Sequence, residues 1–189
     1  MTEKEVLGLF EKSGALLKGH FKLSSGLHSE KYLQCALVLQ HPEIAERLSG
    51  ALANKFSAEK IDVVIGPALG GVTLAYEVAR IVGARGLFTE RQDGKMVLRR
   101  GFSISKGEKV LVVEDVVTTG GSTKEVIDLA RSFGADVVGV GSIIDRSSSN
   151  VDFAVPFRPL ARAEIETFEE SKCPLCEKQI PVTKPGSRK

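Results

Sequence analysis

Residues 110–122 have the sequence VLVVEDVVTTGGS, and this stretch predicts the central unit of the fold. Its apolar start, which lacks alternating polar residues, is typical of a strand covered on both faces, as in a parallel sheet. The two glycines that follow allow a tight turn, and an apolar pattern from Ser122 to Phe133 predicts a helix. We therefore expect a buried strand, a short loop and a helix N-terminus in succession.

The loop of this unit has the features of an anion site. Gly120 and Gly121 allow the backbone to approach a ligand closely, because glycine has no side chain. The hydroxyl groups of Thr118, Thr119 and Ser122 can donate hydrogen bonds. The first N–H groups of the following helix lack partners within the helix and favour negative charge. The sequence therefore predicts that this loop holds a phosphate group.

Two carboxylates just before the loop indicate the kind of phosphate compound. Glu114 and Asp115 would repel a triphosphate unless a metal intervened, whereas ionised carboxylates accept hydrogen bonds from sugar hydroxyls. The segment has neither the Gly-Lys-Ser/Thr of a Walker loop nor the GxGxxG of a dinucleotide loop. A ribose 5-phosphate fits both the acids and the loop. The alternative is an ordinary strand–turn–helix unit in which the acids have no such role.

Two segments carry a resemblance to a known family. All thirteen residues from 110 to 122 fit the phosphoribosyl diphosphate signature of the type I phosphoribosyltransferases, which the segment resembles. Residues 19–34 are similar to the hood of the orotate phosphoribosyltransferases in that family. The residues that fit the hood pattern are Phe21, Leu23, Ser25, Gly26 and Ser29. The resemblance implies an α/β fold with an open, mainly parallel sheet flanked by helices and a small β-rich hood.

The same resemblance implies an activity. The chain would transfer the 5-phosphoribosyl group from 5-phosphoribosyl 1-diphosphate to orotate, giving orotidine 5′-monophosphate and diphosphate in de novo pyrimidine (UMP) biosynthesis. Mg²⁺ would be held through the substrate rather than by dedicated protein ligands. The family also implies a homodimer in which a mobile lid reaches the neighbouring subunit's site. Two alternatives remain open, a purine phosphoribosyltransferase and a non-catalytic regulator on the same fold.

The length and composition agree with a globular protein. The chain has 189 residues, of which 42% are hydrophobic and 26% charged, so a single domain over residues 1–189 is expected. Its core would cover about residues 42–146, and its hood about residues 19–40 and 151–170. A net charge of +2 does not favour nucleic acid, and no apolar run approaches the ~18 residues of a membrane span. Three cysteines without a secretory signal predict a cytoplasmic location.

The resemblance assigns donor binding to the lid and to the central loop. The expected donor-binding residues are Arg91, Lys95, Glu114, Asp115, Val116, Val117, Thr118, Thr119, Gly120, Gly121 and Ser122. Among them, Glu114, Asp115 and Lys95 are the expected catalytic residues. A second strand–glycine loop–helix unit begins with the strand predicted over residues 61–65. The residues of its loop that are expected to meet the pyrophosphate are Ala68, Leu69, Gly70 and Gly71.

The lid is expected within residues 90–102, where Asp93-Gly94 is a hairpin-turn signal. This segment matches the position of the family's mobile lid. A basic lid could neutralise the departing pyrophosphate and exclude water, and Arg91 and Lys95 are the candidates for that role. The alternative is a charged hairpin that is merely solvated, since surface charges are common.

The sequence departs from the resembled family at two basic positions. Many orotate enzymes carry a lysine in the pyrophosphate loop where this chain has Gly70. Another family lysine, in the hood, is replaced by Ser24. Both departures concern how the charge of the pyrophosphate is neutralised.

Orotate binding is assigned to Thr118, Arg146 and Tyr32. Arg146 follows the strand predicted over residues 136–144, at the edge where open α/β sheets bind ligands. In the resembled family an arginine here binds the orotate carboxylate, and a planar guanidinium can donate two parallel hydrogen bonds. The alternatives are a structural ion pair for Arg146 and half-buried packing for Tyr32.

The remaining histidines and cysteines have no assigned role. His20 and His28 are expected at the surface or in a turn, because no acid–base partner stands beside them in the sequence. Cys173 and Cys176 form one C-x-x-C pair in a tail that is predicted to be loop-like. A zinc site needs about four ligands, of which Cys35 could be a third. Zinc, a disulfide and no role at all therefore remain open for this pair.

Overall fold

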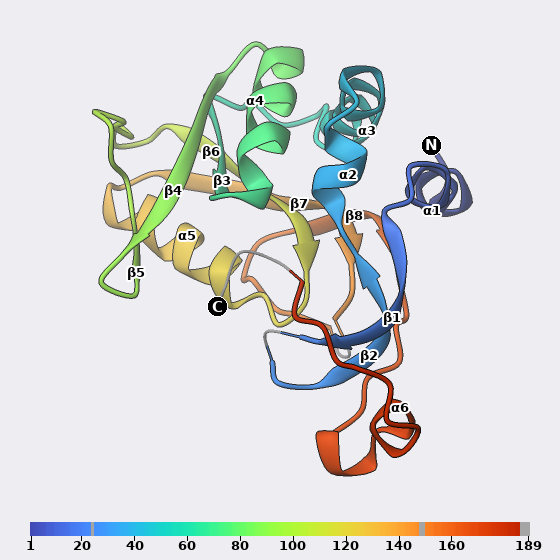
Figure 1. The fold of residues 1–189 in the computed structure, drawn as a ribbon. Helices are drawn as coiled ribbons and strands as arrows, with labels where there is room; N and C mark the ends of the chain where they lie inside the picture. The colour runs from blue at the N-terminus through green and yellow to red at the C-terminus, as the bar shows by residue number, and fades with distance from the viewer. Residues whose placement is uncertain (24, 148–149, 186–189) are drawn as a thin grey trace.

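The computed structural model describes residues 1–23, 25–147 and 150–185 (Figure 1). Its main sheet contains β3 (Val63–Pro67), β4 (Arg85–Gln92), β5 (Lys95–Val97), β6 (Lys109–Val117), β7 (Asp136–Asp145) and β8 (Phe157–Arg162). The strand order is β5-β4-β3-β6-β7-β8. All neighbouring pairs are parallel except β4 and β5, which form an antiparallel hairpin. The predicted open, mainly parallel α/β sheet is confirmed.

Helices cover both faces of this sheet (Figure 1). The helices on one face are α1 (Glu3–Lys12), α2 (Cys35–Leu39), α3 (Pro42–Asn54) and α4 (Gly70–Val82). Helix α5 (Gly121–Ser132) packs against the other face. Adjacent strand residues alternate between the two apolar cores, so that Val64 and Leu111 pack with the first group while Val63 and Val110 pack with α5. Burial on both faces explains why these strands lack alternating polar residues.

The path of the chain reverses in the middle of the sheet. From β3 the chain passes through α4 to β4 on one side, whereas from β6 it passes through α5 to β7 on the other. Strands β3 and β6 are parallel neighbours, with Val63 paired to Val110 and Ile65 to Val112. The loops after β3 and β6 therefore leave the same edge of the sheet in different directions. In open α/β sheets the crevice at such a point is where ligands bind.

A separate two-stranded hairpin forms the hood. It consists of β1 (Leu16–Lys22) and β2 (His28–Leu33), which pair antiparallel. The C-terminal part of the chain contains the 3₁₀ helix η1 (Glu170–Lys172) and the short helix α6 (Pro174–Glu177). Isolated bridges join Phe21 to Thr183 and His28 to Phe168. The C-terminal segment thus covers both edges of the hairpin, which the figure shows as a red chain beside a blue one (Figure 1).

One boundary of the predicted hood differs from the structure. Residues 151–170 were expected to complete the hood, but β8 within that range pairs in parallel with β7 and extends the main sheet. Only the last part of the range reaches the hairpin, where Ser29 Oγ donates to the carbonyl of Glu166 at 2.9 Å and Phe168 bridges to β2. Parallel pairing is a long-range contact and leaves no local signal in the sequence. Ser24 lies outside the described residues.

No helix in the described part of the chain combines the length and apolar character needed to span a bilayer.

Candidate active site

An open cavity of about 1500 Å³ lies at the carboxyl ends of β3 and β6. The predicted site residues that line it are Tyr32, Ala68, Leu69, Gly70, Arg146 and all of residues 114–122. A single drug-sized ligand typically occupies a pocket of about 300–1000 Å³. The cavity therefore has room for two substrates side by side, and the sheet edge brings together residues that are distant in the sequence.

Glu114 and Asp115 form the acidic wall of the cavity. Both lie within β6, and Glu114 is only 8% exposed. The backbone N–H of Val116 donates to Asp115 Oδ1 at 2.9 Å, which fixes that carboxyl group. Burial raises the pKa of Asp115, while hydrogen bonds with Glu114 and Val116 act in the opposite direction. A desolvated acidic pair interacts strongly with any positive charge that develops beside it.

Cys35 lies next to this acidic pair at the start of α2. Burial raises the pKa of its thiol well above the ordinary value, and the charges of Asp115 and Glu114 raise it further. The thiol is therefore neutral and hydrogen-bonds with Asp115 rather than acting as a nucleophile.

The loop at residues 118–121 leads directly into α5. Gly120 is the N-cap of that helix and has a φ of +74°, in the left-handed region that favours glycine. A Cβ at Gly120 would lie 2.6 Å from Val151 Cγ1 and 2.9 Å from Phe153 Cε1, so space as well as backbone conformation requires glycine there. Thr118 and Thr119 are exposed toward the cavity. A helix N-terminus that follows such a loop can bind an anion.

The second glycine loop meets the acids across the crevice. The Ala68 N–H donates to the carbonyl of Thr89 at 2.8 Å, and the Ala68–Leu69 peptide is cis. A Cβ at Gly70 would lie only 2.5 Å from Asp115 Oδ2. No larger side chain, the family lysine included, fits here without displacing Asp115. Gly71 is not among the residues that line the cavity; it packs closely against Gly66 beneath the loop.

Arg146 lies half-buried at the cavity wall, with Tyr32 nearby. Burial lowers the pKa of Arg146, and the charge of Tyr32 acts in the opposite direction. Asp145 does not pair with it, because Asp145 Oδ1 accepts from the Ser147 N–H at 2.9 Å and the Ser147 hydroxyl at 2.6 Å. Within residues 1–23, 25–147 and 150–185, no carboxylate forms an ion pair with this guanidinium. The structure therefore contradicts a structural ion pair there among the described residues.

The predicted lid reaches the cavity only through Met96, and its basic residues lie away from it. Asp93 and Gly94 both have positive φ, 51° and 80°, as a two-residue hairpin turn requires. Arg91 forms two hydrogen bonds with Glu125 on α5, at 2.8 and 2.9 Å. Neither Arg91 nor Lys95 lines the cavity of its own chain. The sequence identified the hairpin, but this chain alone does not bring its basic residues to the acids.

Two residues of the C-terminal tail line the cavity although no role was predicted for them. These are Lys184 and Pro185. The Thr183 N–H donates to the carbonyl of His20 at 2.8 Å, and the Lys22 N–H donates to the carbonyl of Thr183 at the same distance. These backbone bonds hold the tail along the hood. No periodic pattern marks such a segment, so only its lysine could have suggested a phosphate contact.

The prediction that His20 and His28 lie at the surface is wrong. They are 3% and 1% exposed, and they face Cys173 and Cys176 beneath the hood. The cause is the tail, which folds back over the hairpin and buries both imidazoles.

Comparison with known proteins agrees with this geometry. Residues 36–154 match the family model described as the phosphoribosyl transferase domain. The chain is 60% identical, over 100% of both chains, to an orotate phosphoribosyltransferase of Caldanaerobacter subterraneus subsp. tengcongensis. The chain belongs to the orotate phosphoribosyltransferase family.

Further members of the orotate phosphoribosyltransferase family support this assignment. A relative of that name from Thermoanaerobacter sp. is 59% identical over 100% of both chains. The crystal structure of orotate phosphoribosyltransferase from Aeropyrum pernix has a TM-score of 0.71 and 27% identity, covering 83% of this chain and 93% of that one. The family and the type I phosphoribosyltransferase fold predicted from the sequence are both confirmed.

Proposed function

We propose that this chain transfers the 5-phosphoribosyl group of 5-phosphoribosyl 1-diphosphate to orotate, releasing diphosphate and orotidine 5′-monophosphate. The observation that carries the proposal is the position of Arg146. Its guanidinium is half-buried at the cavity wall and forms no ion pair within the described residues. Partial burial of a cation without a partner is unfavourable, so a planar, anionic ligand that supplies a carboxylate fits this wall.

The donor would lie between the two glycine loops. Residues 118–122 would hold its 5′-phosphate, through hydroxyl groups and the helix N-terminus. Glu114 and Asp115 would accept hydrogen bonds from the ribose hydroxyls. As the anomeric C–O bond breaks, positive charge develops on the sugar, and the same carboxylates would stabilise it. The side chains of Val116 and Val117 add no polar group, so their contribution would come from the backbone.

The diphosphate would face the loop at residues 68–71. We propose Mg²⁺ as the cofactor, bound mainly by diphosphate oxygens and water, where it would neutralise the leaving group. Among the described residues, the one cluster of three or more His, Cys, Asp or Glu ligands lies in the hood and does not line the cavity. A cavity without a closed set of protein ligands suits a cation that arrives with the substrate.

Orotate would lie at the opposite wall. Arg146 would donate to its carboxylate, Thr118 would contact its ring, and Tyr32 would cover it. The ring nitrogen of orotate is already a usable nucleophile, so the chain needs no dedicated base. This accounts for the lack of a histidine among the described residues that line the cavity.

The lid, the domain organisation and the location remain part of the proposal. Lys95 and Arg91 would act on the diphosphate of a neighbouring subunit, because neither lines the cavity of its own chain. This requires a homodimer in which each lid closes over the other site. Residues 1–189 would form one domain with a core over about 42–146, and the enzyme would work in the cytoplasm.

A base screen tests the proposed reaction. Purified protein, Mg²⁺ and 5-phosphoribosyl 1-diphosphate are mixed separately with orotate, uracil, adenine, guanine, hypoxanthine and xanthine, and diphosphate release is followed. Turnover with orotate alone supports the proposal. Turnover with a purine would assign a purine phosphoribosyltransferase instead. Donor binding without turnover on any base would assign a non-catalytic regulator.

A further inference from the structure

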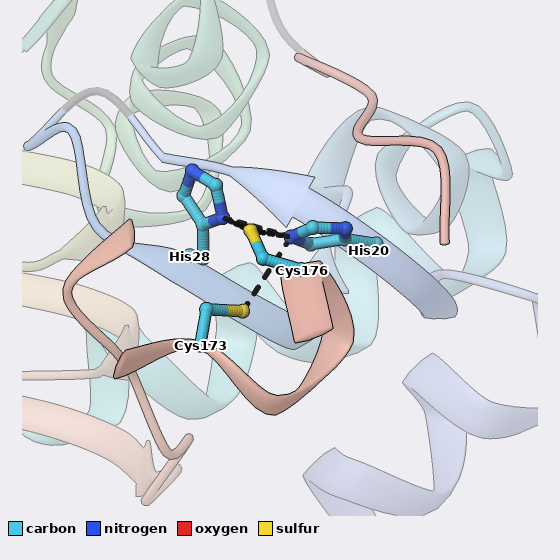
Figure 2. Close-up of side chains that lie close together, drawn as sticks. All are labelled: His20, His28, Cys173 and Cys176. Carbon is cyan, nitrogen blue, oxygen red and sulfur yellow. Dashed lines mark hydrogen bonds between the residues drawn. The ribbon is translucent and has the colours of Figure 1, made fainter. Parts of the chain in front are cut away.

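The hood contains four side chains whose ligand atoms lie within 4.8 Å of one another: His20, His28, Cys173 and Cys176 (Figure 2). His20 comes from β1 and His28 from β2. Cys173 is the N-cap of the short helix α6, and Cys176 lies within that helix. Three of the four residues are buried, and Cys176 is partly exposed. None of them lines the substrate cavity. Both cysteines are free thiols.

We propose that these four residues form a tetrahedral Cys₂His₂ site for a structural zinc ion. Ideal Zn–N and Zn–S bonds of about 2.0 and 2.3 Å imply ligand separations of about 3.3–3.8 Å in a tetrahedron. Cys173 Sγ lies 3.6 Å and Cys176 Sγ 3.7 Å from His20 Nε2, and Cys176 Sγ lies 3.3 Å from His28 Nδ1. The two imidazole nitrogens are 2.8 Å apart and need to separate slightly. Four of the six separations between ligand atoms are thus within about 0.5 Å of those in a tetrahedral zinc site.

Hydrogen bonding at the far side of the rings supports metal binding. His20 Nδ1 lies 2.7 Å from the carbonyl of Ile180, to which it can only donate, so Nε2 carries the lone pair that faces the cluster. Histidine ligands in metal sites are oriented by such a bond from the other ring nitrogen. The cluster therefore presents one imidazole in the tautomer that zinc requires.

His28 provides a second observation that points to a metal. Its Nε2 is buried and has no hydrogen-bond partner among the described residues, while Glu170 Oε2 lies 3.9 Å away. Without a metal, the contact between the two histidines makes His28 Nδ1 the donor, which leaves a lone pair on Nε2 facing a carboxylate. With zinc bound at Nδ1, the proton moves to Nε2 and faces Glu170 instead. In the metal-bound state the buried Nε2 thus carries a proton directed at the Glu170 carboxylate, as is usual for the second ring nitrogen of a histidine ligand.

The ligand chemistry selects the metal. Two thiolates and two imidazoles in a tetrahedron suit Zn²⁺, whereas Mg²⁺ and Ca²⁺ prefer oxygen ligands in larger shells. Four protein ligands leave no open position, which is typical of a structural rather than a catalytic site. Zinc here would join the hairpin to the segment that carries Lys184 and Pro185 to the cavity. Its role would be to hold the hood and the tail together.

Metal analysis of the full chain tests the site. Protein purified under reducing conditions without chelators should contain about one zinc per chain. Replacement of zinc by Co²⁺ should give the intense visible absorption of a tetrahedral thiolate site. Removal of zinc by a chelator should lower the thermal unfolding midpoint by about 5–10 °C, and added zinc should restore it.

Matched variants localise the metal. His28→Gln and Cys176→Ser should both lose stoichiometric zinc, whereas His41→Gln, which changes the one histidine outside the cluster, should retain it. Cys176 is partly exposed, so its serine variant tests the site even if His28→Gln fails to fold. The inference is overturned if the wild-type chain binds no more zinc than His28→Gln after incubation with the metal. A Cys173–Cys176 disulfide in protein purified without reductant, together with absent zinc, would overturn it as well.

Discussion

Arg146 is the residue to which we assign the selection of orotate. If its guanidinium binds the orotate carboxylate, Arg146→Ala should raise the KM for orotate by about 10–100-fold, since a charge-assisted pair contributes about 1.5–3 kcal/mol. The KM for 5-phosphoribosyl 1-diphosphate should change much less. Steady-state kinetics with each substrate varied in turn measure both effects. Arg131→Ala, at an exposed position in the last turn of α5, is the control. Equal changes in both KM values would contradict the assigned role.

Replacing Asp115 is expected to raise stability and to lower activity. Burial raises its folded-state pKa above the ordinary 3.8, so the folded protein binds this proton more tightly than the unfolded chain does. The free energy of unfolding therefore falls as the pH rises through the folded-state pKa. Asp115→Asn has no carboxyl group to ionise, so its free energy of unfolding does not fall in this way. The variant should have a higher urea midpoint than the wild type at pH 7, and the difference should shrink as the pH falls toward about 3–4, the range of an ordinary aspartate.

The same variant should be a poorer enzyme. Removing one charge that stabilises the developing cation should lower kcat by about 10²-fold or more. Stability curves for both proteins, recorded at several pH values alongside kcat, test the two effects together. A difference in urea midpoint that does not vary with pH would show that Asp115 carries no buried charge.

The sequence predicts the position of a single residue well where its neighbours in the site are also its neighbours along the chain. The segment from Glu114 to Ser122 lines the cavity because its acids, glycines and hydroxyls follow one another along the chain. His20 and His28 were placed wrongly, because their burial depends on a tail about 150 residues further along. The steric conflict at Gly70 was also beyond prediction, since Gly70 begins α4 whereas Asp115 lies in β6.

The loop between β6 and α5 gives a prediction at the scale of an element. Gly120→Ala places a Cβ 2.6 Å from Val151 in a backbone conformation with positive φ. We expect a loss of about 1–3 kcal/mol in the free energy of unfolding and a marked rise in the KM for the donor. Gly8→Ala is the matched control, because Gly8 lies inside α1 with nothing within 4 Å of its Cβ position. That change should instead stabilise the protein by about 0.5–1 kcal/mol. Urea unfolding of both variants distinguishes the two cases.

The β4–β5 hairpin gives a second prediction for an element. Arg91 is held by Glu125 in an exposed ion pair, so Arg91→Ala should change the free energy of unfolding by less than about 1 kcal/mol. If the hairpin closes over a site, kcat/KM for the donor should nevertheless fall by about 10²-fold. Arg80→Ala removes another exposed, paired arginine and should leave kcat/KM unchanged. An unchanged kcat/KM in Arg91→Ala would show that the hairpin is merely a solvated charged loop.

Helices, strands and turns were predictable where the apolar pattern or the turn residues lie within the element itself. The Asp93-Gly94 turn, the proline at the start of α3 and the apolar run of β6 each specify an element within a few residues. The strand with which a given strand pairs is not predictable in this way. Strand β8 was expected in the hood, but it pairs with β7. The prediction failed because the residues of β8 do not indicate which sheet edge the strand joins.

At the scale of the whole molecule, the position of the lid predicts shared active sites. Lys95→Ala and Asp115→Asn should each be nearly inactive alone. If each lid closes over the partner's site, the subunit with intact acids receives the intact lid of its partner in a mixed dimer, so one complete site is restored. Random mixing should then recover up to about a quarter of the wild-type activity.

A second mixture provides the control for this experiment. Asp115→Asn with Glu114→Gln should recover nothing, since both changes lie in the acidic wall and each site keeps one defect. Differently tagged subunits show by co-purification that mixed dimers have formed. No recovery in the lid mixture despite proven mixed dimers would place the lid over its own chain.

The tail that covers the hood also determines which parts of the protein can fold first during synthesis. His20 and Cys173 are separated by 153 residues, so the covering segment is synthesised long after the hairpin. Until these later residues have left the ribosome, both edges of the hairpin lack their neighbours, and Lys184 cannot reach the cavity. The main sheet can form during translation, whereas the wall of the substrate cavity is completed only afterwards. A nascent or C-terminally truncated chain would therefore be folded at its centre before it could hold both substrates.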